Sequence, residues 1–182
     1  MKLVAIVGSL RKDSYNLKVA KEIKERYQKK HDIEILRLND LPLFNQDIEK
    51  DPPSSVLDFK EKIKKADGVI IVTPEYNHSI PGVLKNAIDW CSRVDRVLVN
   101  KPVMILGASD GNVGTARCQG DLRKVLNAPG IAAMVLPGNH ILIPTVQNLF
   151  DDNDKFTDTR TLEYIDKIIV RFEEWSKLID SK

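Results

Sequence analysis

Three short polar segments of this chain carry the residue types that could bind an anion or a flat heterocycle. The first, GSLRKDSYN, covers residues 8–16 and lies directly before a predicted helix. Backbone amides at a helix N-terminus attract anions, and an arginine can bind two phosphate oxygens at once. Helix capping explains only part of this combination, so we predict a site for a terminal phosphate monoester. Its residues are Ser9, Arg11, Ser14 and Asn16.

The second segment, PEYNHS at residues 74–79, follows the most apolar stretch of the chain. A proline fixes the exit from that stretch, and the next three residues present backbone groups, an aromatic face and an amide. A flat heterocycle with polar edges fits these groups, although proline and asparagine are also common in plain strand-to-helix connections. The candidate residues are Pro74, Glu75, Tyr76 and Asn77.

The third segment, GASDGNVG at residues 107–114, allows two interpretations. Ser109 and Gly111 are small, so a ligand could come close to the backbone there. The same residues match G-x-S-x-G, the nucleophile elbow of α/β-hydrolases, with Asp121 as the orienting acid and His140 as the base. A serine hydrolase is therefore an alternative function, but it leaves the first two segments unexplained.

Other familiar signatures are missing from the sequence. The first segment has neither G-x-G-x-x-G nor G-x-x-x-x-G-K-[ST], which argues against the usual NAD cradle and against an ATPase. The three histidines are scattered without metal-ligand spacing, so we predict no metal site. Apart from the hydrolase alternative, the pattern assigns no side chain to catalysis.

The composition is that of one soluble globular domain spanning residues 1–182. Hydrophobic residues make up 42% and charged residues 30% of the chain, which is enough apolar material for one core. The net charge of +2 gives no field that favours nucleic acid, and the apolar runs are too short to span a bilayer. Cys91 and Cys118 match neither a disulfide framework nor a CxxC motif, so we expect buried, reduced thiols in a cytoplasmic protein.

The elements that must position the three polar segments alternate between strand and helix. Short apolar runs predict strands at residues 2–7, 32–38, 68–73, 101–106 and within 128–137. Apolar positions with helical spacing predict helices at residues 14–28, 56–66, 81–93, 115–126 and 159–179. Such alternation is typical of a doubly wound parallel sheet with helices on both faces. Ligands bind such sheets beyond the carboxyl ends of the strands, so the polar segments should meet there.

The segments GSLRKDSYN, TPEYNHSIPGVLKNAIDW and GASDGNVGT, in this order, resemble the NADPH-dependent FMN reductase family. The resemblance covers nearly the whole chain and implies a flavodoxin-like α/β fold with five parallel strands in the order 2-1-3-4-5. It implies that the four named residues of the first segment hold the FMN phosphate and that those of the second border the isoalloxazine ring. Ser109 and Gly111 would then close the ribityl and ring side.

The family includes quinone, azo-dye and chromate reductases. The resemblance therefore implies an FMN-dependent NAD(P)H oxidoreductase with ping-pong kinetics, in which hydride passes through FMN to a quinone, azo compound, free flavin or similar small molecule. The chain lacks the Thr- and Gly-rich phosphate loop and the acidic surface usual in flavodoxins, which favours an enzyme over a non-turnover electron carrier. The pattern does not select between NADPH and NADH as the co-substrate.

The predicted helix at residues 81–93 is apolar over more than one face, because Ile88, Trp90 and Cys91 do not share a single stripe. A helix of this kind usually buries a second face, and two explanations are open. The second face could form the interface of a homodimer or homotetramer, which in the family borders the flavin. Trp90 could instead pack under a loop of its own chain.

Overall fold

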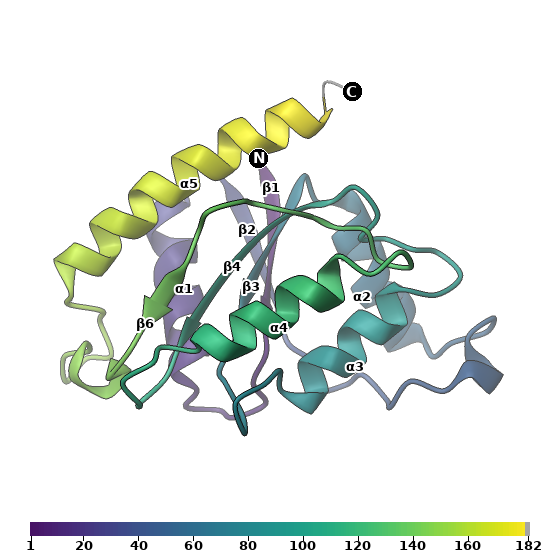
Figure 1. Cartoon of the computed structure of the whole chain (residues 1–182), viewed down its shortest axis with the longest axis horizontal. Coiled ribbons are helices and arrows are strands. Elements are labelled where there is room, and N and C mark those ends of the chain that lie inside the picture. Colours follow the sequence, from purple (N-terminus) through teal and green to yellow (C-terminus); the bar gives the residue numbers. More distant parts are fainter. Residues whose placement is uncertain (181–182) are drawn as a thin grey trace.

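The computed structural model describes residues 1–180 of the chain, in which strands and helices alternate (Figure 1). The strands are β1 (Lys2–Val7), β2 (Asp32–Leu36), β3 (Gly68–Val72), β4 (Pro102–Ala108), β5 (Met134–Val135) and β6 (Ile141–Ile143). The helices are α1 (Tyr15–Tyr27), α2 (Ser54–Lys65), α3 (Gly82–Cys91), α4 (Ala116–Leu126) and α5 (Thr159–Asp180), with short 3-10 helices at Gln46–Ile48 and Val146–Asn148. The predicted helices and the first four predicted strands are all present, with ends within two residues of the predicted ones.

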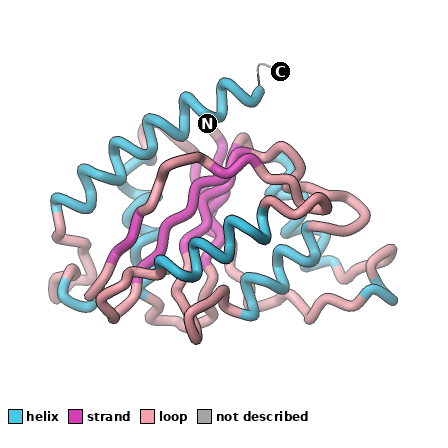
Figure 2. The backbone as a smooth tube through the Cα atoms, viewed as in Figure 1, coloured by secondary structure: helices cyan, strands magenta, loops and turns pink. Residues whose placement is uncertain are grey.

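The strands form one parallel sheet in the order β2-β1-β3-β4-β5, which lies between two layers of helices (Figure 2). This is the predicted flavodoxin-like order. The chain moves outward from β1 to β2 on one side, and from β3 to β4 and β5 on the other. The connections therefore diverge at the β1–β3 pair, and the carboxyl end of that pair is where such folds bind ligands.

The prediction of five strands is wrong at one edge of the sheet, where the fifth strand is broken into two. β5 pairs with the first two residues of β4, and β6 pairs with its last three. Between the two pieces, Pro137 has no backbone N–H to donate, and Gly138 adopts a left-handed φ of 64°. The buried side chain of Asn139 donates to the carbonyl oxygen of Ile105 at 3.0 Å and replaces a backbone hydrogen bond there.

Two separate hydrophobic clusters cover the two faces of the sheet. α1 and α5 lie on one face, whereas α2, α3 and α4 lie on the other (Figure 1). Successive residues of β1, β3 and β4 alternate between the clusters, because side chains of a strand point to opposite faces in turn. Burial on both faces explains why these strands read as continuous apolar runs in the sequence.

The second apolar face of α3 is covered by the loop that follows β2. The Trp90 side chain is 2% exposed, and its Nε1 donates to the carbonyl oxygen of Pro42 at 2.9 Å. The Phe44 ring packs edge-on against the indole, with 5.0 Å between the ring centroids. Of the two explanations for this face, the structure therefore supports packing under a loop, and Trp90 is not available to a partner.

The strand ends pack so closely that a side chain at Gly107 would not fit. A Cβ atom there would overlap the backbone carbonyl oxygen of Thr73 and the hydroxyl of Thr115. Gly120 in α4 is the opposite case, because nothing lies within 4 Å of the Cβ that an alanine would add.

Gly107→Ala should therefore lower the free energy of unfolding by about 2–3 kcal/mol, the cost of overpacking against backbone that cannot move aside. The matched control, Gly120→Ala, should raise it by about 0.5–1 kcal/mol through helix propensity and a less flexible unfolded chain. Urea unfolding followed by circular dichroism measures both changes. A Gly107→Ala variant as stable as the parent would contradict the close packing of β3 and β4 at this end.

Candidate functional site

The sheet ladder continues beyond the strand ends and sets the starting points of three loops. We call them loop 1 (residues 8–14), loop 3 (residues 73–81) and loop 4 (residues 109–115), after β1, β3 and β4. Their first residues still pair with the neighbouring strand, so the loops leave the sheet side by side, as predicted. The bonds are Gly8 N to Val72 O at 2.9 Å, Thr73 N to Leu106 O at 3.0 Å, and Ser109 N to Ile143 O at 3.0 Å.

Loop 1 presents two buried serines at the start of α1. Ser14 is the N-cap, and its hydroxyl oxygen accepts from the backbone N–H of Leu17 at 3.4 Å. The Ser9 hydroxyl oxygen accepts from the N–H of Arg11 at 3.4 Å. Among residues 1–180, neither hydroxyl donates a hydrogen bond, so both protons are free for an anion. The first turn of α1 holds no acidic residue, and the Arg11 side chain is exposed.

The Asn16 side chain binds the backbone at the end of β4. Its side-chain Nδ2 donates to the carbonyl oxygen of Ala108 at 2.8 Å, and its Oδ1 accepts from the N–H of the same residue at 2.9 Å. The side chain is buried and both ends of the amide bind backbone. Asn16 therefore links the first turn of α1 to the end of β4 and uses one of its two Nδ2 hydrogens to do so.

Loop 3 contains a tight hairpin at its tip. Tyr76 and Ser79 exchange two backbone hydrogen bonds of 3.1 and 3.0 Å. Between them, Asn77 and His78 have φ angles of 49° and 65°, and two successive left-handed residues are the signature of a type I′ turn. Asparagine and histidine tolerate this conformation better than most residues. The turn leaves the side chain of Tyr76 44% exposed, so its ring is open to a ligand.

The Glu75 carboxylate anchors loop 3 to α4. Its side chain is 10% exposed and accepts from the N–H of Cys118 at 3.0 Å and from Arg117 Nη1 at 3.3 Å. The N-cap residue of α4, Thr115, provides no side-chain cap, so the carboxylate satisfies a helix amide that would otherwise lack an acceptor. The negative charge of Glu75 thus lies at the positive end of a helix.

A second contact between loop 3 and α4 was missed by the sequence analysis. The Ser79 hydroxyl donates to Asp121 Oδ2 at 2.8 Å. This bond, together with the ammonium of Lys124, lowers the pKa of the Asp121 carboxyl. The two attachments together hold both arms of the hairpin to one helix.

Loop 4 is held by the segment that follows β6. The Gly111 carbonyl oxygen accepts from the N–H of Thr145 at 3.1 Å, and the Ser109 carbonyl oxygen accepts from the N–H of Val146 at 3.0 Å. The loop ends at Thr115, which adopts a left-handed φ of 71° although it is β-branched. The backbone of both predicted residues of this loop, Ser109 and Gly111, is therefore held in place by the segment that follows β6.

The hydrolase alternative does not assemble in the structure. The Ser109 hydroxyl donates to the Gly111 carbonyl oxygen at 3.2 Å, and Asp121 is bound by Ser79 rather than by His140. Within residues 1–180, no hydrogen bond joins the three proposed triad members. Ser109 also lacks the positive φ that would mark a strained turn, whereas Thr115, at the end of the same loop, has one.

The two cysteines are free and buried, as predicted. Burial raises the pKa of the Cys91 thiol to about 12. Burial also raises the pKa of Cys118 to about 11, with smaller contributions from the nearby carboxylates of Glu75 and Asp121. Neither thiol is ionised at neutral pH, so neither is poised as a nucleophile.

Large apolar side chains are exposed on each of the three loops. Leu10 of loop 1 is 40% exposed, Tyr76 of loop 3 is 44% exposed and Val113 of loop 4 is 41% exposed. Such groups at the rim of a polar site favour flat, partly apolar ligands. The arrangement thus combines anion donors at loop 1 with apolar and backbone groups at loops 3 and 4.

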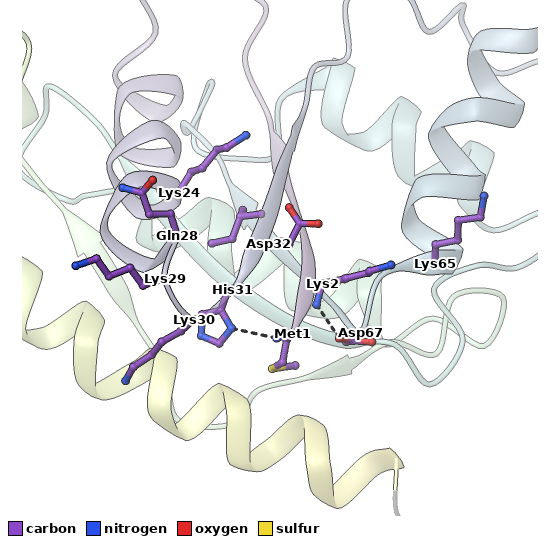
Figure 3. A pocket seen from close by; sticks show the side chains of 11 residues that line it. Met1, Lys2, Lys24, Gln28, Lys29, Lys30, His31, Asp32, Lys65 and Asp67 are labelled. Carbon is purple, nitrogen blue, oxygen red and sulfur yellow. Dashed lines mark hydrogen bonds between the residues drawn. The ribbon is translucent and has the colours of Figure 1, made fainter.

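A hollow of about 830 Å³ lies at the opposite end of the sheet, beside the amino ends of β1 and β2 (Figure 3). Four of its lysines, Lys24, Lys29, Lys30 and Lys65, end or follow α1 and α2. Basic residues are favoured there because they offset the negative end of the helix dipole. Figure 3 shows these side chains pointing in different directions rather than toward a common point.

Comparisons with known proteins show which family the chain is similar to. A family model described as NADPH-dependent FMN reductase matches residues 1–148. The NADH-dependent flavin reductase subunit 2 of Lactobacillus johnsonii is 40% identical over 185 residues, which cover 99% of this chain and 98% of that protein. The quinone reductase of Escherichia coli (strain K12) is 38% identical over 180 residues, which cover 96% of this chain and 95% of that protein.

A solved structure extends the similarity to three dimensions. The flavoenzyme NAD(P)H:(acceptor) oxidoreductase of Paracoccus denitrificans superimposes with a TM-score of 0.83 at 31% identity, and the match covers 97% of both chains. None of the helices within residues 1–180 has the length and apolar character that crossing a membrane requires.

Proposed function

The chain belongs to the NADPH-dependent FMN reductase family, and we propose that it is an oxidoreductase that moves reducing equivalents from NAD(P)H through FMN to a quinone, flavin or similar acceptor. The observation that carries this proposal is similarity to flavin and quinone reductases over almost the full length of the chain. The proposal is also supported by the fold, because three loops with suitable donors leave the sheet side by side at the end where the switch point between β1 and β3 lies. The serine hydrolase alternative has no support from the relatives or from the contacts of Ser109.

The donors of loop 1 fit the phosphate of FMN. Ser9 and Ser14 have hydroxyl protons to donate, and Arg11 brings a full positive charge. No acidic residue in the first turn of α1 opposes a dianion. We propose these three residues and the loop amides as the phosphate site, with Asn16 holding the loop in place.

Loops 3 and 4 fit the flavin ring and the ribityl chain. Residues 74–77 of loop 3 offer backbone groups and the exposed Tyr76 ring, and Ser109 and Gly111 offer a fixed backbone without bulk. When bound, FMN supplies the two-electron redox chemistry, and the protein binds and orients it. Exposed apolar groups around the site would receive a flat acceptor such as a quinone.

We also propose that the protein acts as a homodimer or homotetramer in the cytoplasm. A second copy would cover part of the exposed apolar rim formed by Leu10, Tyr76 and Val113 and leave the rest open to the acceptor, and this replaces the expected contact through Trp90. The two buried free thiols agree with a reducing compartment. Light scattering at micromolar concentration tests the assembly, and a monomer would contradict it.

The purified protein with added FMN should show a bound flavin spectrum that bleaches when NADPH or NADH is added without oxygen. Addition of a quinone should then restore the oxidised spectrum, with stoichiometric loss of the quinone. The result that contradicts the proposed function is a flavin that binds but is reduced by neither nicotinamide cofactor. Hydrolysis of p-nitrophenyl esters serves as the control for the rejected alternative.

Arg11→Ala should weaken FMN binding about ten- to a hundred-fold, because a hydrogen bond to a charged group contributes about 1.5–3 kcal/mol and each 1.4 kcal/mol is tenfold. Binding of riboflavin, which has no phosphate, should barely change. Lys12→Ala is the matched control in the same loop and should have a much smaller effect on either flavin. Fluorescence quenching in titrations of the apo forms gives the affinities. Equal losses for FMN and riboflavin would mean that Arg11 does not contact the phosphate.

A further inference from the structure

Arg37 lies directly after β2 and reaches under loop 1. Its Nη2 donates to the carbonyl oxygens of Leu10 at 3.2 Å and Arg11 at 3.3 Å. The side chain is half-buried, and its Nε is buried with no hydrogen-bond partner among the described residues. A planar guanidinium that binds two successive carbonyls fixes the orientation of both peptide groups.

The orientation of these carbonyls determines where the loop amides point. In a trans peptide the N–H points away from the carbonyl oxygen, and the described chain has no cis peptide bond. The carbonyls of Leu10 and Arg11 face Arg37, so the N–H groups of Arg11 and Lys12 face the other side. The Arg11 N–H reaches the Ser9 hydroxyl oxygen, which lies on that side. Successive amides with a common direction form an anion-binding concavity. Because the Arg11 N–H is bound to Ser9, the Lys12 N–H is the amide of this pair that would face an anion.

The charge of Arg37 is not neutralised by an ion pair with any residue that the structure describes. It borders a hollow of about 250 Å³ that also holds Asp40, Asp58 and Lys62. Asp58 is bound by Lys62 at 2.9 Å, and among the described residues Asp40 forms neither a hydrogen bond nor an ion pair with the guanidinium. A permanent, half-buried charge behind the loop attracts an anion on its front, and solvent screens it less than it screens the exposed Arg11.

We propose that Arg37 is a positioning residue for the FMN phosphate: it holds loop 1 by two carbonyls so that the amides face the phosphate, and it adds a second permanent positive charge behind them. This inference rests on the proposed function, because it assumes that loop 1 binds the phosphate. It assigns a role to a residue outside the three polar segments, on a strand end that carries no motif.

Affinities for FMN and riboflavin, measured by fluorescence quenching, test the role of Arg37. Arg37→Gln should weaken FMN binding about tenfold or more and riboflavin binding less than about threefold, because only FMN carries the charge that Arg37 favours. Arg37→Lys keeps the charge but replaces the planar guanidinium, whose Nη2 donates both bonds, with a shorter and more flexible side chain, so its loss for FMN should be intermediate. Arg171→Gln is the matched control. Arg171 lies on α5 and also donates to a backbone carbonyl oxygen, that of Pro137, at 3.0 Å. It should change neither affinity.

The outcomes separate this inference from the proposed function. A parent protein that binds FMN and riboflavin equally would overturn the phosphate site and the role of Arg37 together. A parent that prefers FMN, with the same preference in Arg37→Gln, would overturn the role of Arg37 alone. If Arg37→Gln weakened the binding of FMN and of riboflavin equally, Arg37 would have only a structural role, and the inference would also be overturned. If Arg37→Gln does not fold, an unchanged FMN preference in Arg37→Lys is the result that contradicts the inference.

Discussion

A buried amide joins the first turn of α1 to the end of β4, and the position of the three loops depends on it. Asn16 binds both the N–H and the carbonyl oxygen of Ala108, although β3 lies between β1 and β4 in the sheet. A buried backbone group left without a partner costs about 1–3 kcal/mol, so the pair of bonds selects one relative position of helix and strand. Close packing reinforces it, because a Cβ at Gly8 would lie 2.6 Å from the Thr73 hydroxyl. The ends of β1, β3 and β4 thus form one compact platform.

Loops 1 and 3 are each fixed in position by side-chain hydrogen bonds from a neighbouring element. Arg37 holds loop 1 from behind, and α4 holds loop 3 through Glu75 and Asp121. Several positions adopt left-handed backbone, including Asn77 in the hairpin and the β-branched Thr115 at the start of α4. Local strain of this kind persists only where the surroundings determine the conformation, and it is frequent in ligand sites. A site prepared in this way loses little conformational entropy when it binds a cofactor.

The sequence predicted the elements well where burial controls the pattern. β1 and β3 are buried on both faces and read as apolar runs, and α1 reads as a helix because its apolar residues share one face. The fifth strand was harder, because a side chain, Asn139, replaces a backbone bond across the break. The periodicity of apolar residues gives no signal for a side chain that takes the place of a backbone hydrogen bond.

The candidate site was only partly predictable for a related reason. A polar residue at the start of a helix can bind a ligand or its own backbone, and the choice depends on a partner far away in the sequence. Asn16 and Ala108 are 92 residues apart, and Glu75 and Cys118 are 43 apart. Arg37 stands at the end of a strand, where an arginine is an ordinary surface residue, and only the contacts with the Leu10 and Arg11 carbonyls distinguish it.

The central claim is that the carboxyl end of the sheet binds FMN, with the phosphate at loop 1 and the ring at loops 3 and 4. A crystal structure of the protein with FMN tests it most directly. The phosphate should lie within hydrogen-bonding distance of the Ser9 and Ser14 hydroxyls, with the flavin ring beside Tyr76. Ordered FMN in the lysine-lined hollow at the amino ends of β1 and β2, with nothing bound at loop 1, would contradict it.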